Sequence, residues 1–220
     1  MASSLRQAAT CIGLRLPLST TRNFFGITAQ PVALSLGTQL RRLSNRHVHF
    51  NIIRVGGDQF TAADEAEIDA AVQLTRDLYA AAGIGVGRIE HYWITTAEAA
   101  GRDVINSDSE AETLTDEWTV PNHALDIFFV RMYVSSTAGL SRVGGSCDKD
   151  AKGMDGSVVE MNTGGGVSDY ALAHEACHYL GNGHRSDNDA LMSPTVPNTG
   201  LINSTEAGRM SNHCFARPGC

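Results

Sequence analysis

Residues 174–184 place three histidines and a glutamate at a spacing, HExxHxxGxxH, that strongly restricts how the chain can fold. On an α-helix, positions i and i+4 lie one turn apart on the same face, so His174 and His178 can direct their imidazoles toward one ion. Gly181 can end this helix, because glycine adopts positive φ without steric cost. The chain can then turn back and bring His184 toward the first two histidines.

The residue types in this motif indicate a zinc site of the open, catalytic kind. Three histidines leave one position of a tetrahedral zinc ion free for water. Glu175 is rotated by about 100° from His174 around the helix, so it can reach that water but is poorly placed as a third ligand. We therefore expect Glu175 to act as a general base. The expected ligands of one catalytic Zn²⁺ are His174, His178 and His184.

The motif and the segment after it resemble those of the metzincin metalloproteases. Residues 184–194, HRSDNDALMSP, are similar to the matrixin pattern H-S-x-D-x-x-A-L-M-x-P. The departures are Arg185, where matrixins usually have Ser, and Ser193, which replaces the Tyr of the family. The resemblance implies that Met192 is the Met-turn residue, which packs beneath the metal. No tyrosine follows Tyr179, so a tyrosine ligand of the astacin kind is excluded.

The resemblance also implies a fold and an activity. The implied fold is an α+β, metzincin-like zincin domain, with a twisted, mostly parallel sheet, an antiparallel edge strand, an active-site helix and a C-terminal helix. The implied activity is that of a zinc-dependent metalloendopeptidase acting on a protein or peptide substrate, with strand 157–161 as the exposed edge that binds it in extended form. An extracellular location is implied as well, although the chain has no clear secretory signal peptide.

Two other functions stay open. One is a zinc hydrolase of non-peptide amides that uses the same residues. The other is a metal-stabilised binding module without turnover. Glu175 favours an enzyme over a binding module, because zinc binding alone does not need that carboxylate.

Hydrophobic patterning predicts the remaining helices and strands, which describe a small α/β or α+β domain with one sheet. A helix is expected to begin after Thr61 and to end at Gly83. Residues 125–134 are almost continuously apolar, which is typical of a central strand buried on both faces. The other expected strands are 47–55, 88–95 and 157–161, the other expected helices are 169–180 and about 204–213, and the expected loops are 97–123 and 135–156.

Charge divides the chain near residue 46. Residues 1–46 hold six of the 17 basic residues and no acid, which leaves 11 basic and 24 acidic residues in 47–220. We expect a basic N-terminal segment over 1–46 (a leader, a pro-segment or extra strands) and the catalytic domain over 47–220. A net charge of −7 argues against a nucleic-acid partner. No apolar run is long enough for a transmembrane segment, and the sequence leaves the oligomeric state unknown.

Two further groups of residues are weaker metal candidates. Asp148, Asp150 and Asp155 lie in a glycine-bearing loop that could hold calcium, although a solvated acidic loop is the preferred interpretation. His47 and His49 alternate on one strand and could bind a second metal, but a pair without metal is preferred.

The cysteine count is odd, so at least one thiol is free or pairs between chains. Two disulfides among the last four cysteines and a fully reduced set both fit the sequence. Cys177 is expected to pack or to form a disulfide, and Cys11 either caps the zinc as a thiolate or has no role there. The five positions are Cys11, Cys147, Cys177, Cys214 and Cys220.

Overall fold

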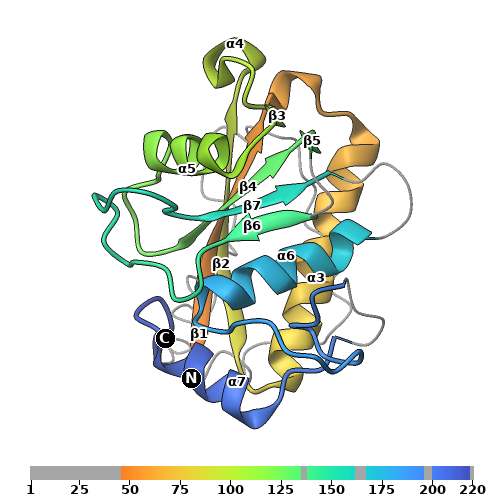
Figure 1. The fold of residues 1–220 in the computed structure, drawn as a ribbon, viewed down its shortest axis with the longest axis vertical. Helices are drawn as coiled ribbons and strands as arrows, with labels where there is room; N and C mark the ends of the chain where they lie inside the picture. Colours follow the sequence, from red (N-terminus) through yellow and green to blue (C-terminus); the bar gives the residue numbers. More distant parts are fainter. Residues whose placement is uncertain (1–45, 135–137, 162–166, 196–199, 219–220) are drawn as a thin grey trace, which may run out of the picture.

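The computed structural model describes residues 46–134, 138–161, 167–195 and 200–218 (Figure 1). Apart from Arg46, the basic segment 1–46 lies outside the described residues, as do Cys11 and Cys220, and the division of the chain at residue 46 stays a prediction. The elements in chain order are β1 (His47–Val55), η1 (Gly57–Gln59), α3 (Ala62–Ala81), β2 (Gly85–Ile94), α4 (Thr96–Ala99), β3 (Val104–Ile105), α5 (Asp108–Glu117), β4 (Leu125–Val130), β5 (Met132–Tyr133), β6 (Gly139–Ser141), β7 (Ser157–Glu160), α6 (Val167–Tyr179) and α7 (Ser204–Asn212).

The main sheet has five strands in the order β2-β1-β4-β7-β6. Neighbouring strands are parallel except at the end of the sheet, where β6 is antiparallel to β7. Parallel neighbours need a crossover connection, and α3 provides it between β1 and β2. The prediction of an α+β fold with a mostly parallel sheet and one antiparallel edge strand is confirmed.

Strand β4 lies in the centre of the sheet, and all six of its residues are buried. Helices α3 and α6 pack on each other and share one apolar core with one face of β4 (Figure 1). A second core on the other face includes Phe128 and Val130 of β4 with Leu114 of α5. This burial on two faces is the reason for the nearly continuous apolar run.

Helix α3 begins and ends as its sequence predicts. The Thr61 side chain accepts from the backbone N–H of Asp64, and the Asp64 side chain accepts from the backbone N–H of Thr61, which forms a capping box. Gly83 follows the helix with φ 81°, the left-handed conformation that glycine tolerates. The Tyr79 hydroxyl donates to the Ala173 carbonyl at 2.9 Å and so joins α3 to α6.

The expectation of a loop over residues 97–123 is wrong. The segment includes most of α4 and all of β3 and α5, and β3 pairs with β5 in a separate two-stranded sheet. Ser107 caps α5 by accepting from Glu110 N, and Ala111 and Leu114 are its buried apolar residues. An acidic helix of ten residues with so few apolar positions has too short a periodic pattern to stand out.

The expected substrate-binding edge is also wrong. Strand β7 is paired with β4 on one side and with β6 on the other, so residues 157–161 offer no free edge. The edge strand is β6, which lies within the segment 135–156 that we expected to be a loop. It has three residues, Gly139–Ser141, which is too short for alternation to be recognised.

None of the described helices combines the length and the apolar character needed to cross a bilayer.

Candidate metal centre

The end of α6 positions the first part of the motif. Gly181 has φ 105°, and its N–H donates to the His178 carbonyl at 2.9 Å. The next N–H, that of Asn182, donates to the Cys177 carbonyl at 3.2 Å. These two bonds form a Schellman motif, which satisfies carbonyls of the last turn and reverses the chain. The predicted stop at Gly181 is present, and the chain returns with His184 as expected.

The structure brings together the three predicted ligands, His174, His178 and His184, here called the histidine triad. The Nε2 atom of His184 lies 3.2 Å from Nε2 of His174 and 3.0 Å from Nε2 of His178. One nitrogen from each ring lies within 4.8 Å of the others, so the three can share one metal ion.

Backbone carbonyls orient two rings of the triad. His174 Nδ1 lies 2.6 Å from the Leu191 carbonyl oxygen, and His178 Nδ1 lies 2.7 Å from that of Asn182. Carbonyls can only accept, so each Nδ1 carries the proton and each Nε2 turns a lone pair toward the centre. Such outer hydrogen bonds are typical of metal-ligating histidines, and converging lone pairs favour a cation between them. The residues present therefore fit a divalent metal.

Burial keeps these rings in the neutral form that binds metals. It is the main cause that lowers the pKa of His178 to about 4, with a further contribution from His174. Burial also lowers the pKa of His174. A neutral imidazole is the ligand form, so the protein does not need to remove a proton from these rings near neutral pH.

Glu175 directly follows His174 in α6 and is buried. Burial raises the pKa of its carboxyl to about 8, and a hydrogen bond with the Ser141 side chain opposes this shift. Its Oε2 atom is buried without a hydrogen-bond partner among the described residues. An orphaned carboxylate oxygen is costly unless a further group, such as a water or a substrate, meets it.

Met192 lies in a tight turn whose preceding residue, Leu191, contacts the histidine triad. The Leu191 carbonyl, one residue before Met192, is the one that holds His174. The Met192 side chain is fully buried in the core under α6, and its carbonyl accepts from Arg185 N at 2.9 Å. This position agrees with the expected Met-turn, whose role toward a metal stays a proposal.

Three residues near the site were not singled out from the sequence. Ser141 and Gly139 of β6 contact Glu175, and the carbonyl of Asn182 orients His178. Asn182 could have been suspected, because it precedes His184 within the motif. The two β6 residues carry no such signal, since they are brought to Glu175 by the sheet.

The other metal candidates are not assembled into sites. Among the described residues, the groups of three or more that could share an ion are the histidine triad and Cys147, His213 and Cys214. The loop acids Asp148, Asp150 and Asp155, for which calcium was the less favoured alternative, belong to neither group. Asp155 instead accepts from the Tyr179 hydroxyl at 2.9 Å. His47 and His49 contact each other, with ring centroids 4.9 Å apart, but join no such group.

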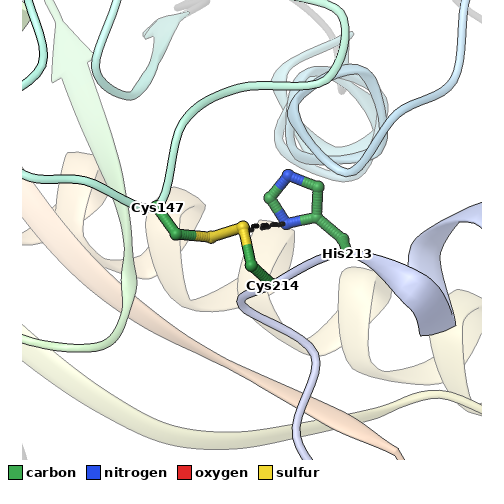
Figure 2. Close-up of side chains that lie close together, drawn as sticks. All are labelled: Cys147, His213 and Cys214. Carbon is green, nitrogen blue, oxygen red and sulfur yellow. Dashed lines mark hydrogen bonds between the residues drawn. A yellow bond between two sulfur atoms is a disulfide. The ribbon is translucent and has the colours of Figure 1, made fainter.

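The three cysteines that the structure describes form one disulfide and leave one free thiol. Cys147 and Cys214 are disulfide-bonded (Figure 2). Cys177 is free and buried, with its Sγ 3.7 Å from Sδ of Met210 in α7. Of the two expectations for Cys177, packing is therefore the one observed.

Comparison with known proteins agrees with the fold. No protein-family model matches the chain, and the search of curated proteins finds no match either. Among solved structures, metalloproteinase-II from Bacteroides fragilis is similar, with a TM-score of 0.53 and 16% sequence identity. The match covers 76% of this chain and 53% of that one, so the chain spans about half the length of that protein. This likeness concerns the fold alone, which is similar to that of metalloproteinase-II.

Proposed function

We propose that this protein is a zinc-dependent metalloendopeptidase of the metzincin type, with a matrixin-like segment after its third histidine. The observation that carries the proposal is the convergence of three imidazole nitrogens beside a buried carboxylate with an unpaired oxygen. The structural likeness to metalloproteinase-II supports the same conclusion at the level of the fold.

Each residue of the site has a distinct part in the proposed reaction. His174, His178 and His184 hold the ion, which when bound supplies Lewis acidity toward a peptide carbonyl and toward water. Glu175 takes a proton from the attacking water at Oε2 and delivers it to the leaving amine. Burial raises the pKa of Glu175, which makes it a stronger base, and a bound cation beside it would favour the carboxylate form that accepts the proton.

The proposed substrate lies along β6. This strand is the last of the described sheet, and its outer edge has no described strand beside it. An extended peptide can add to such an edge through main-chain hydrogen bonds. Ser141 and Gly139 contact Glu175, so a peptide on this edge would pass close to the proposed base. The proposal for 157–161 is thereby replaced by one for Gly139–Ser141.

A paired measurement of zinc content and peptide cleavage tests the function. Parent protein is expected to bind zinc and to cleave a mixed peptide library in a chelator-sensitive manner. Glu175→Ala should keep the zinc and lose cleavage by about 10²- to 10⁴-fold, the usual contribution of a general base. Glu112→Ala, which removes an exposed carboxylate from α5, is the matched control and should behave as the parent does.

The same measurement separates the alternatives when a panel of small amides is assayed beside the peptide library. A zinc amidohydrolase would cleave small amides and leave the peptide library intact. A binding module would hold zinc without cleaving either substrate. Parent-like cleavage by Glu175→Ala would contradict the proposed mechanism.

The proposal includes an extracellular location. The Cys147–Cys214 disulfide supports it, because disulfides persist in oxidising compartments. Fractionation of the source cells, with labelling of free thiols in the recovered protein, tests this part separately.

A further inference from the structure

A second group of possible metal ligands lies apart from the histidine triad. Cys147 belongs to the loop between β6 and β7, whereas His213 and Cys214 directly follow α7 (Figure 2). The Nδ1 atom of His213 is 3.9 Å from Sγ of Cys147 and 4.0 Å from Sγ of Cys214. We call these three residues the sulfur cluster.

The ring of His213 is oriented as a metal ligand would be. Its Nε2 lies 3.0 Å from the Gly145 carbonyl oxygen, so Nε2 carries the proton. The Phe215 N–H donates to Nδ1 at 3.3 Å, which independently identifies Nδ1 as the unprotonated nitrogen. Nδ1 also lies within 4.0 Å of both sulfur atoms, so an ion bound at this nitrogen would displace the Phe215 N–H. His174 and His178 likewise have one ring nitrogen at a backbone carbonyl, and their other nitrogen faces the histidine triad.

The distances suit zinc once the sulfur atoms are thiolates. In a tetrahedral site, Zn–S and Zn–N bonds of about 2.3 and 2.0 Å place nitrogen and sulfur roughly 3.5 Å apart. The observed nitrogen–sulfur separations of 3.9 and 4.0 Å are within about 0.5 Å of this value, and the two sulfur atoms, bonded to each other in the disulfide, must move apart to about 3.8 Å after reduction. Cys147 and His213 are half-buried, and Cys214 is exposed, so water can supply a fourth ligand.

We propose that the sulfur cluster is a redox-dependent zinc site: when a dithiol reduces the disulfide, Cys147, Cys214 and His213 bind one Zn²⁺. The reduction transfers two electrons and two protons, so the S–S bond breaks, two thiols form, and the dithiol becomes a disulfide. Zinc then replaces the two thiol protons, which pass to solvent. Two thiolates balance the charge of the ion, and neutral His213 supplies the third bond.

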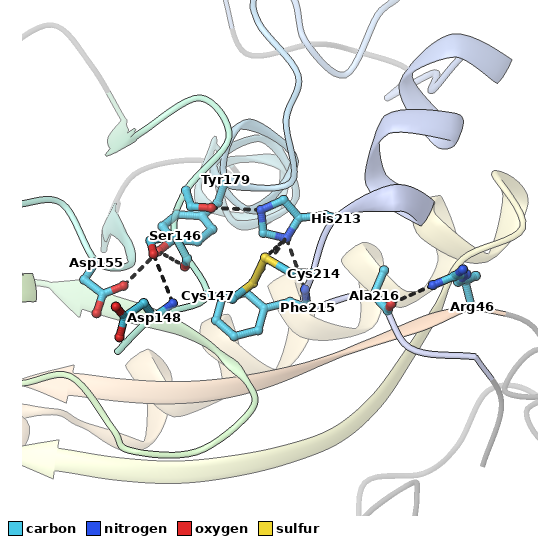
Figure 3. Close-up of a disulfide and its surroundings, with 11 residues drawn as sticks. Arg46, Ser146, Cys147, Asp148, Asp155, Tyr179, His213, Cys214, Phe215 and Ala216 are labelled. Carbon is cyan, nitrogen blue, oxygen red and sulfur yellow. Dashed lines mark hydrogen bonds between the residues drawn. A yellow bond between two sulfur atoms is a disulfide. The ribbon is translucent and has the colours of Figure 1, made fainter. Parts of the chain in front are cut away.

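A zinc ion at the sulfur cluster would anchor the loop between β6 and β7, which supports the end of α6. The N–H groups of Gly144 and Gly145 donate to the carbonyls of His178 and Tyr179 at 3.0 and 2.9 Å. The Tyr179 hydroxyl donates in turn to the Ser146 carbonyl at 2.8 Å (Figure 3). Either a disulfide or a zinc ion at Cys147 would tie this loop to the segment after α7. Zinc would thus replace the cross-link in reducing surroundings, where a disulfide does not persist.

Zinc content before and after reduction tests the proposal on the full chain. The protein is dialysed against zinc with and without a phosphine reductant, thiols are counted, and bound metal is measured by elemental analysis. The reduced protein is expected to hold one more zinc ion per chain than the oxidised protein. The zinc content of the oxidised protein reports on the histidine triad alone, and the zinc gained on reduction reports on the sulfur cluster. The proposed redox-dependent site and the proposed peptidase function can therefore fail independently.

Cobalt substitution identifies the ligands of the additional ion. Thiolate ligands give Co²⁺ an intense sulfur-to-metal charge-transfer band in the near ultraviolet, which an all-histidine site does not produce. This band is expected only after reduction. Reduced thiols without an additional ion, or an additional ion without this band, would overturn the proposal.

Variants separate the sulfur cluster from other sources of binding. His213→Ala keeps both cysteines and should weaken the additional site by more than about 100-fold, since loss of an outer partner alone costs 10- to 100-fold. His123→Ala removes another histidine that packs on Phe215 and should change nothing. A Cys11→Ser/Cys220→Ser background should still gain the ion. Gain of the ion by Cys147→Ser/Cys214→Ser, or no loss of affinity in His213→Ala, would overturn the assignment.

Discussion

Gly139 packs against Glu175 so closely that a Cβ atom at position 139 would lie 2.7 Å from Glu175 Cγ. The same Cβ would lie 2.5 Å from the carbonyl oxygen of Val158, which belongs to the backbone of β7. A backbone atom within a sheet cannot move aside easily. The missing side chain at position 139 is therefore what allows the edge strand to lie beside the proposed base.

Gly139→Ala is expected to impair catalysis while zinc stays bound. The added methyl must displace Glu175, and a displacement of about 1 Å can lower the rate by about 10²-fold. We expect kcat to fall about 10- to 100-fold, measured on a peptide substrate together with zinc content. Gly208→Ala in α7 is the control, because a Cβ there meets no atom within 4 Å. Turnover equal to the parent's in Gly139→Ala would show that this contact does not position Glu175.

Gly181→Ala is expected to destabilise the end of α6 and to weaken metal binding. Residue 181 has φ 105°, where a Cβ is strained, and a cost of about 1–2 kcal/mol is expected. The return of the chain to His184 depends on this turn, so zinc affinity should fall as well. Urea unfolding and a zinc titration measure the two effects. Gly183→Ala, at a glycine with ordinary φ and no atom within 4 Å of the added Cβ, should leave the unfolding free energy within about 0.5 kcal/mol of the parent's.

Metal removal is expected to lower thermal stability. An ion that binds the folded state alone stabilises it by about 2.7 kcal/mol at a hundredfold excess over Kd. Chelation should therefore lower the Tm of the oxidised parent, and added zinc should restore it. His178→Ala should start from the lower Tm and respond to neither treatment. A chelator effect of full size in this variant would mean that the stabilising ion lies elsewhere.

Acid is expected to destabilise the fold through two histidines of the sheet. Burial lowers the pKa of His49 and that of His91 to about 4. In the unfolded chain each pKa lies near 6.5, so the folded state binds fewer protons between these values. This contribution to stability is complete above pH 6.5 and is lost as pH falls toward 4.

Urea unfolding at pH 7.5 and pH 5 measures this loss. Each histidine should contribute about 1 kcal/mol of it, allowing for partial exposure. His49→Asn and His91→Gln keep a polar side chain without a titrating ring. Each variant should therefore lose less stability between the two pH values than the parent does. Equal losses in parent and variants would assign the acid sensitivity to other groups.

The Cys147–Cys214 disulfide is expected to contribute to stability even without zinc. The bond joins residues separated by 67 positions, and cross-links over loops of this size stabilise by about 2–4 kcal/mol. Cys147→Ser/Cys214→Ser should lose this amount in urea unfolding, in the presence of a chelator. Cys177→Ser changes a thiol that forms no disulfide and should leave the effect of a reductant on the Tm intact.

Interactions within a few residues along the chain were predicted from the sequence. The spacing of His174, His178 and Gly181 gave the helix, its end and the return of the chain. The cap at Thr61 and the buried position of β4 were likewise predicted correctly. In each case the deciding contacts either span one helical turn or lie within a run of side chains in a single element.

Tertiary structure alone decided which residues from distant segments meet. The placement of β6 at the sheet edge, the approach of Gly139 to Glu175, and the pairing of Cys147 with Cys214 depend on strand order and loop closure. Three-residue strands and short acidic helices carry little pattern of their own, and they are stabilised by packing against elements far away in the sequence. The sequence therefore determined which residues form the proposed ligand set and its local geometry, because i and i+4 contacts need no partner element. The sheet decided which residues surround the proposed ligands, because the register of its strands is set by burial over the whole domain.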